Sequence, residues 1–182
     1  MSAKHKAVYG MTQMGKTWLM KRRAKILAQK KQKILVYSGV GDIEWPKSAK
    51  VTMEAEILEY WLGQKENERA FVFLDEAAIL IDEASKRKDF PNIHRLLQAG
   101  RHKGFTCFLA TQYPTSIPLK WRTNCDETYC FRLGDEESAK LVWADNSRKK
   151  INDKPMYKEI LELKKLEFIH IIKPDYIEKK TL

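Results

Sequence analysis

Eight consecutive residues near the start of the chain decide its fold class: Gly10-Met11-Thr12-Gln13-Met14-Gly15-Lys16-Thr17. They match the pattern GxxxxGK[ST] of a phosphate-binding P-loop. An apolar run over residues 6–9 precedes them and a helical pattern over 16–29 follows, so the stretch joins a strand to a helix, as a P-loop must. The sequence therefore predicts a site for ATP.

Each fixed position of this pattern has a chemical reason. Gly10 and Gly15 allow the backbone to turn its amides around a phosphate. The first turn of the helix points its positive end at the same anion. We expect Lys16 to reach the β- and γ-phosphates and the Thr17 hydroxyl to bind Mg²⁺.

Two further strand ends carry polar side chains suited to ATP hydrolysis. The apolar run over 71–74 ends in Asp75 and Glu76, and burying two carboxylates is costly unless cations or water compensate them. We expect Asp75 to hold Mg²⁺ and Glu76 to act as general base toward the attacking water. Gln112 follows the apolar run over 105–110, and its amide can contact the γ-phosphate or the water. The alternative for both strand ends is an ordinary polar turn.

Strands and helices alternate along the rest of the chain. Helical spacing occurs at 54–63, 91–100 and 135–144, and strand-like runs occur at 34–38, 128–133 and 166–172. Such alternation is typical of parallel strands joined by crossover helices on both faces of a sheet. We predict one domain over 1–182, an α/β three-layer sandwich with a mostly parallel central sheet that closes with the last of these strands.

Composition limits the remaining possibilities. With 182 residues, 43% of them hydrophobic, the chain is long enough for a sizeable core. No apolar stretch reaches the length of a membrane span, and we expect no signal peptide. Three cysteines are too few for a disulfide framework and lack zinc-site spacing. A formal net charge of +10 favours a polyanionic partner, nucleic acid above all.

The segments around the third strand end resemble a known superfamily. LLQAGRHKGF over 96–105 and LATQYP over 109–114 give a helix ending in Arg, a Gly, an apolar strand and then Thr-Gln-x-Pro. Over roughly residues 4–135 the chain resembles the FtsK/HerA superfamily of DNA-pumping ATPases. Within it, the short chain is similar to the genome-packaging ATPases of tailless icosahedral viruses with internal membranes. The resemblance implies a RecA-like P-loop core that uses ATP to move double-stranded DNA into a preformed capsid.

The resemblance also implies roles for single residues. Gln112 becomes the γ-phosphate sensor. Such enzymes usually form hexameric rings in which an arginine from a neighbouring subunit completes each ATP site. Arg101 lies in the matching segment, whereas Arg122 and Arg132 flank the strand after Pro118, and we favour Arg122.

One departure from the FtsK group affects the expected partners. Full-length members of that group carry membrane spans or a DNA-reading winged-helix domain, and nothing in this sequence corresponds to them. We therefore expect movement along DNA that the base sequence does not direct. We also expect a capsid or membrane vertex protein that anchors the ring. The expected location is the host cytoplasm or a packaging vertex of the virion.

A ring that moves DNA needs basic loops that contact phosphates without reading bases. The favoured candidate is Lys86-Arg87-Lys88, in the segment between the Asp75-Glu76 strand end and the next helix. The runs over 148–150 and 30–33 are the other candidates. A solvated basic surface is the alternative for each of them.

Three other functions compete with DNA translocation. A small-molecule P-loop kinase fits the size, but Glu76 and the Thr-Gln-x-Pro turn argue against it. A phage morphogenesis or DNA-mobilisation ATPase that does not package is the second, and a module that uses ATP only as a switch is the third. A GTPase is disfavoured because the sequence lacks an NKxD motif.

Overall fold

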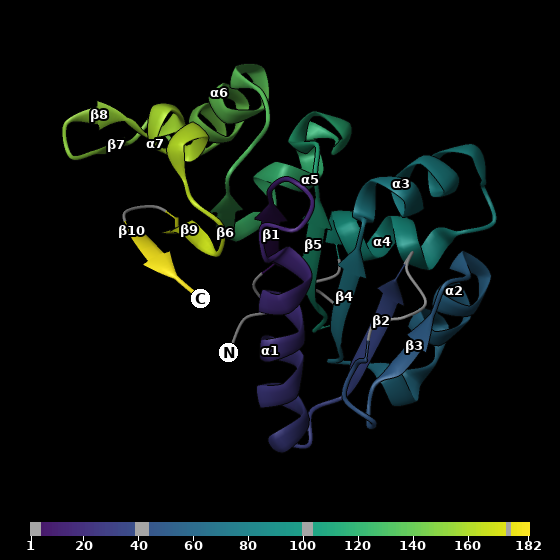
Figure 1. Ribbon diagram of the computed structural model, residues 1–182. Coiled ribbons are helices and arrows are strands. Elements are labelled where there is room, and N and C mark those ends of the chain that lie inside the picture. The colour runs from purple at the N-terminus through teal and green to yellow at the C-terminus, as the bar shows by residue number, and fades with distance from the viewer. Residues whose placement is uncertain (1–4, 39–43, 100–103, 174–175) are drawn as a thin grey trace.

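The computed structural model describes residues 5–38, 44–99, 104–173 and 176–182. Its central element is an eight-stranded sheet with the strand order β10-β9-β6-β1-β5-β4-β2-β3 (Figure 1). Strands from β6 to β3 in this order are parallel, and β9 and β10 are antiparallel additions at one edge. The strands are β1 His5–Tyr9, β2 Ile34–Ser38, β3 Lys50–Thr52, β4 Phe71–Asp75, β5 Thr106–Thr111, β6 Cys125–Phe131, β9 Glu167–Ile172 and β10 Tyr176–Thr181.

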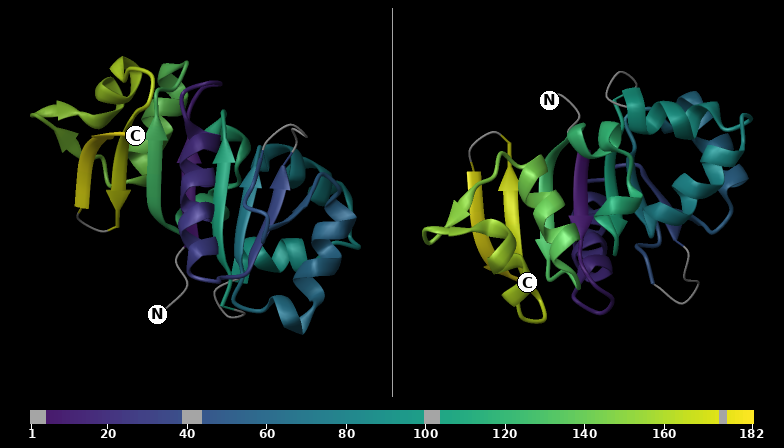
Figure 2. Two further views of the ribbon diagram at one scale, coloured as in Figure 1. Left: turned by 60° about the horizontal axis from the view of Figure 1, so that its bottom comes forward. Right: turned by 90° about the horizontal axis from the view of Figure 1, so that it is seen from above.

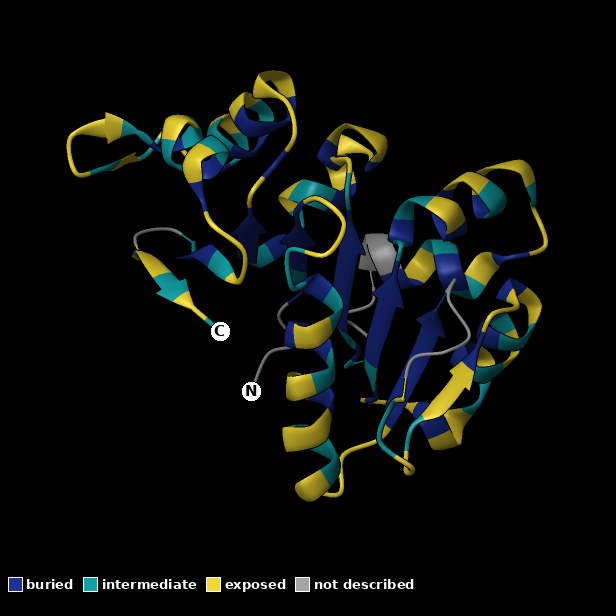
Figure 3. Cartoon of the chain, in the orientation of Figure 1, coloured by how far each residue is buried: buried dark blue, intermediate teal, exposed yellow. Residues whose placement is uncertain are grey.

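The parallel strands are apolar on both faces because helices cover both faces. In β2, Ile34 and Val36 pack in the core that includes α1 (Lys16–Gln29), whereas Leu35 and Tyr37 pack in the opposite core. The central strands are buried along their length, while the outer faces of the helices are exposed (Figure 3). Continuous apolar runs in the sequence are the direct result of this double burial.

Among the described helices, α1 covers one face of the sheet and the others cover the opposite face (Figure 2). The predicted three-layer α/β sandwich with a mostly parallel sheet is thus confirmed. Within the described residues, no helix combines the length and apolar character needed to cross a membrane. The helices opposite α1 are α2 Ala55–Gly63, α3 Ala77–Lys86, α4 Pro91–Ala99, α5 Leu119–Thr123, α6 Glu136–Asp145 and α7 Met156–Glu162.

Most predicted elements are confirmed. The helix over 16–29 and the strand over 34–38 have the predicted bounds, and the other predicted elements agree within three residues. The expectation that the sheet closes with the strand over 166–172 is wrong, because β10 pairs antiparallel with β9 beyond it. Three consecutive charged residues in β10, Glu178, Lys179 and Lys180, hide the apolar signal of this edge strand.

Several short elements were not expected from the sequence. They include β3, α3, α5, α7, β10 and a two-stranded hairpin of β7 (Lys150–Ile151) and β8 (Lys154–Pro155). Most of them are too short to show a periodic pattern. The most consequential is α3, since the segment was expected to hold a basic loop and instead forms a helix directly after Glu76.

The strand order brings the predicted catalytic residues to one edge of the sheet. β1 pairs in parallel with β5, which places Tyr9 opposite Thr111. β5 pairs in parallel with β4, which places Leu109 opposite Leu74. The P-loop, Glu76 and Gln112 therefore follow three adjacent strands at their carboxyl ends, where ligands of α/β sheets bind.

Candidate nucleotide-binding and hydrolysis site

The P-loop is a tight turn between β1 and α1 that requires glycine at two positions. Gly10 has a φ of +154° and Gly15 a φ of +118°, values that residues with a Cβ rarely adopt. A Cβ on Gly10 would lie 2.6 Å from the Cβ of Phe131, and one on Gly15 would lie 2.8 Å from Cδ1 of Leu182. The two glycines thus allow neighbouring segments to pack directly on the loop.

The first turn of α1 is suited to an anion. Gly15 is its N-cap and offers no side-chain acceptor, and no acidic residue lies in the first turn. The helix therefore directs its first amides and the positive end of its dipole toward this point. A cavity of about 260 Å³ lies here, lined by Gln13, Gly15, Lys16, Thr17, Trp18 and Leu166. Together these features fit a bound phosphate group.

Lys16 is 5% exposed and folds across the P-loop. Its Nζ donates to the carbonyl oxygen of Gly10 at 2.7 Å and to that of Met11 at 3.0 Å. Burial lowers the pKa of the Lys16 ammonium, and the carboxylates of Glu76 and Asp75 act in the opposite direction. A phosphate oxygen is a stronger acceptor for this ammonium than two neutral carbonyls.

Thr17 and Asp75 meet across the site. The Thr17 hydroxyl donates to the Asp75 carboxylate, with distances of 3.1 and 3.2 Å to its two oxygens. Asp75 is 3% exposed, and burial raises the pKa of its carboxyl; the Thr17 hydrogen bond lowers it and the charge of Glu76 raises it further. A hydroxyl and a buried carboxylate side by side are a donor set that fits Mg²⁺.

Replacing Asp75 by Asn should raise the stability of the nucleotide-free protein. A carboxyl whose pKa is raised by folding is harder to ionise in the folded state, so its charge lowers stability above that pKa. We expect a higher urea midpoint for Asp75→Asn at pH 7, and a difference from wild type that shrinks as the pH falls to the ordinary pKa of 3.8. The exposed Asp82 is the matched control, and a lower midpoint for Asp75→Asn would contradict this account.

Glu76 and Gln112 form a hydrogen-bonded chain with the P-loop. The Thr12 hydroxyl donates to Oε1 of Gln112 at 2.8 Å, and Nε2 of Gln112 donates to Oε1 of Glu76 at 3.1 Å. Glu76 has a φ of +60°, an unusual conformation for a residue with a side chain and one found at functional sites. Gln112 thus joins the phosphate-binding loop to the carboxylate at the end of β4.

The turn after β5 holds Gln112 in place. The Thr111 hydroxyl accepts a hydrogen bond from the backbone amide of Tyr113 at 3.2 Å. Pro114 is buried and begins a short 3-10 helix, Pro114–Ser116. The hydroxyl and the ring together fix the backbone on both sides of the amide side chain. This arrangement explains why the Thr-Gln-x-Pro order suits the site.

The expected role of Arg122 does not fit its position. Its Nε lies 2.6 Å from Oδ2 of Asp145, and its Nη1 donates to the carbonyl of Ile117. The side chain is 9% exposed, so this arginine links α5 to α6 within one chain and is not presented to a neighbour. Arg101 lies outside the described residues, and Arg132 is exposed directly after β6.

The basic segment at 86–88 also differs from the expectation. Lys86 ends α3 and pairs with Asp82 at 2.6 Å. Arg87 pairs with Glu56 and with Asp89, and its guanidinium lies over the ring of Phe90. Carboxylates therefore neutralise two of the three cations, and the segment is not a free basic loop.

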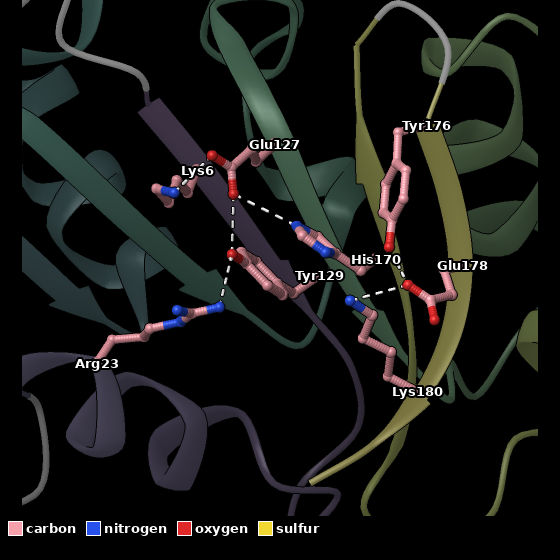
Figure 4. Close-up of polar contacts among 8 residues, drawn as sticks. All are labelled: Lys6, Arg23, Glu127, Tyr129, His170, Tyr176, Glu178 and Lys180. Carbon is pink, nitrogen blue, oxygen red and sulfur yellow. Dashed lines mark hydrogen bonds and ion pairs between the residues drawn. The ribbon is translucent and has the colours of Figure 1, made fainter. Parts of the chain in front are cut away.

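A second polar cluster lies on the α1 face of β6 and β9, apart from the nucleotide site (Figure 4). Glu127 is at its centre and accepts hydrogen bonds from Lys6 at 2.6 Å and from the Tyr129 hydroxyl at 2.9 Å, with His170 at 3.3 Å. Burial acts to raise the pKa of Glu127, but the contacts with His170, Lys6 and Tyr129 outweigh it and lower the pKa to about 2. This network joins three strands of the sheet and is structural.

Replacing Glu127 by Gln is expected to lower the free energy of unfolding by about 2 kcal/mol at pH 7. A carboxyl whose pKa is lowered by folding stabilises the protein above its unfolded value of 4.5, and this stability is lost as the pH falls through about 2. The urea midpoints of wild type and Glu127→Gln should therefore converge as the pH falls from 4.5 to about 2. Glu178→Gln, at a half-exposed carboxylate nearby, is the control; equal losses in both variants would contradict a central role for Glu127.

Thr12 is predicted from the sequence only as part of the P-loop pattern. Its contact with Gln112 depends on β1 lying beside β5, although the two strands are about a hundred positions apart. The only available signal was a hydroxyl residue inside the loop. The strand order that gives it a partner is not readable from local patterns.

Comparisons with known proteins agree with this geometry. The family model for zonular occludens toxin (Zot) matches residues 17–167, more than half of the chain. The genome packaging NTPase B204 from Sulfolobus turreted icosahedral virus 2, solved with AMPPCP, has a TM-score of 0.78 at 17% identity, covering 100% of this chain and 99% of that chain. The pCW3 conjugation coupling protein TcpA, solved as a monomer with ATPγS, has a TM-score of 0.74 at 16% identity and covers 99% and 60%. A search of curated protein sequences finds no match.

A further similar structure is the cytoplasmic domain of the type VII secretion ATPase EccC from Thermomonospora curvata. Its TM-score is 0.71 at 14% identity, and the match covers 97% of this chain and 25% of that chain. These structures share the overall fold of this chain. The chain belongs to the zonular occludens toxin (Zot) family and has the fold of the FtsK/HerA-type P-loop ATPases.

Proposed function

We propose that this protein is an ATPase that moves double-stranded DNA. The observation that carries the proposal is the hydrogen-bonded chain from Thr12 through Gln112 to Glu76. It links the phosphate-binding loop to a carboxylate at the position suited to activating water. A small-molecule kinase gains nothing from such a carboxylate, because activated water would consume its ATP. ATP hydrolysis coupled to the movement of DNA is the function that uses both the phosphate-binding loop and this carboxylate.

The residues of the site divide the chemistry between them. The P-loop amides and Lys16 bind the triphosphate. Mg²⁺, held through Thr17 and Asp75, would neutralise charge on the phosphate oxygens. The water oxygen bonds to the γ-phosphorus, the bond from that phosphorus to the bridging oxygen of ADP breaks, and the water proton passes to Glu76. Gln112 orients Glu76 and contacts the loop that holds the phosphates. Loss of the γ-phosphate can therefore alter the position of the Gln112 side chain.

DNA is the polymer that the charge and the comparisons favour. The chain carries a formal net charge of +10, which attracts polyanions. B204 is described as the DNA-packaging ATPase of Sulfolobus turreted icosahedral virus, and TcpA as a conjugation coupling protein. Both are fold relatives at low sequence identity, and both descriptions support a DNA substrate for this chain.

We extend the proposal to genome packaging by a hexameric ring docked on a capsid or membrane vertex. The support is the near-complete mutual coverage with B204, which leaves little of either chain outside the shared fold. A subunit of this size with one ATP site gains processivity when several copies surround the same DNA.

ATP turnover measured with and without duplex DNA tests the proposed function. We expect turnover to rise several-fold on adding linear duplex DNA, and Lys16→Ala to abolish both basal and stimulated rates. Turnover that is indifferent to DNA would reject a translocase. Transfer of the γ-phosphate to a nucleoside or metabolite would instead establish a kinase.

A further inference from the structure

A two-stranded hairpin projects from the region that joins β6 to β9. β7 and β8 pair antiparallel, and Asn152 and Asp153 form the turn between them with φ values of +51° and +62°. Positive φ at both central residues is the requirement of a type I′ turn, the tight turn that suits the twist of a hairpin. The hairpin extends away from the sheet beyond α7 (Figure 1), and most of it is exposed (Figure 3).

The hairpin and its flanks are strongly basic. Residues 146–158 include five basic residues and one acidic residue, Asp153. Four of the five basic side chains are exposed, and among the residues that the structure describes none of the five forms an ion pair. The five are Arg148, Lys149, Lys150, Lys154 and Lys158.

Two other basic surfaces are less suited to a duplex. At 86–88, carboxylates occupy two of three cations. On α1, Lys21, Arg22 and Lys25 line a groove of about 1060 Å³ together with Trp18, Trp45 and Glu44. The α1 cations line a recess that they share with the carboxylate of Glu44, whereas a projecting ribbon presents its cations outward. A two-stranded ribbon is also a shape that the major groove of B-DNA admits.

The base of the hairpin is firmly attached to α6. The indole Nε1 of Trp143 donates to the carbonyl of Lys149 at 2.8 Å, and the amide of Met156 donates to the same carbonyl at 3.1 Å. Asn146 is buried, and its Nδ2 donates to the carbonyl of Val142 at 2.7 Å. Any displacement of α6 therefore moves the hairpin with it.

The other end of α6 lies close to the nucleotide site. β6 is parallel to β1, so the segment after β6 lies beside the P-loop. There the amide of Met11 donates to the carbonyl of Arg132 at 2.9 Å. Asp135 then caps α6 by accepting from the amide of Ser138 at 2.7 Å. One helix thus connects a P-loop contact to the basic hairpin.

We infer that the β7–β8 hairpin, through Lys150 and Lys154, and the first turn of α7, through Lys158, bind the phosphate backbone of duplex DNA. The inference rests on the proposed function, which supplies DNA as the substrate, and it identifies the surface that holds it. Contacts of this kind are independent of base sequence and depend strongly on salt.

A triple variant, Lys150→Ala with Lys154→Ala and Lys158→Ala, tests the assignment. The control is Lys21→Ala with Lys25→Ala on α1 and Lys30→Ala at its C-cap, which removes the same charge. Affinity for a fluorescent duplex is measured by anisotropy across a salt series, together with basal ATP turnover. Losing three phosphate contacts should reduce the slope of log affinity against log salt by about 2.7. The basal ATP turnover of the hairpin variant should equal that of wild type. The salt slope of the control variant should also equal that of wild type.

Each alternative outcome is informative. Equal changes in both triple variants would show that net charge alone matters and would overturn the hairpin assignment. A hairpin variant that loses binding to anionic lipid vesicles but keeps its duplex slope would assign the surface to a membrane instead. If duplex DNA stimulates ATP turnover in wild type and the hairpin variant keeps the wild-type salt slope for duplex binding, this inference alone is overturned. Wild type that neither binds duplex nor responds to it would overturn the proposed function as well.

Discussion

Replacing Glu76 by Gln is expected to lower ATP turnover about 10³-fold while leaving ATP affinity within a few-fold of wild type. The amide has the shape of the carboxylate and can still accept a hydrogen bond from Nε2 of Gln112, which lies 3.1 Å from Oε1 of Glu76. It cannot take a proton from water. Rates of phosphate release, with calorimetric titration of a non-hydrolysable ATP analogue, measure the two quantities separately.

Glu83→Gln provides the matched control for this variant. Glu83 lies on α3, two turns along the helix from Glu76, and no role in the site is assigned to it. We expect its turnover to equal that of wild type. Near-normal turnover in Glu76→Gln would exclude this carboxylate as the general base, and loss of ATP binding in that variant would show that the substitution damages the P-loop side of the site.

Replacing Gln112 by Ala should lower turnover about 10²-fold with little change in the KM for ATP. The substitution removes both hydrogen bonds that connect Thr12 to Glu76, so the base loses its orientation while the phosphate cradle remains. A positioning role predicts a loss in kcat, whereas a role in holding ATP predicts a rise in KM. Steady-state kinetics over a range of ATP concentrations distinguish the two.

Tyr113→Ala is the control beside Gln112. Tyr113 is 60% exposed, and within the described part of the chain its hydrogen bonds involve its backbone only, so turnover should stay near wild type. Equal loss in both variants would indicate damage to the turn after β5. Unchanged turnover in Gln112→Ala would remove this residue from the catalytic account.

Local patterns predicted the parts of the fold that local physics controls. The helix over 16–29 starts at the P-loop lysine and is amphipathic, so both its start and its inner face were readable. The strand over 34–38 is buried throughout, and its uninterrupted apolar run gave its bounds. Asp75 and Glu76 were identified because carboxylates at the end of a buried strand need a chemical reason.

Ion pairs between residues far apart in the sequence could not be predicted from it. Arg122 pairs with Asp145, which is 23 positions away in the sequence. Arg87 pairs with Glu56, which is 31 positions away. Whether a surface cation is free depends on which carboxylate the fold brings near, and neither composition nor spacing contains that information.

The hairpin over 150–155 was not predicted from the sequence for a different reason. Asn-Asp at its tip is a turn signal, and both residues tolerate positive φ. Its strands are two residues long, however, which is too short for an alternating pattern to be visible. The run over 148–150 is one of the basic candidates in the sequence, but only the structure shows that it leads into a projecting hairpin and that, among the described residues, its side chains form no ion pair with a carboxylate.

Movement along DNA is the central claim, and displacement of a third strand measures it most directly. A linear duplex carries a fluorescent triplex-forming oligonucleotide at one end, and release of that strand is followed over time. We predict release that requires ATP, fails with ADP or with Glu76→Gln, and occurs later as the duplex between entry point and triplex is lengthened. ATP hydrolysis stimulated by DNA without any release of the third strand would contradict translocation.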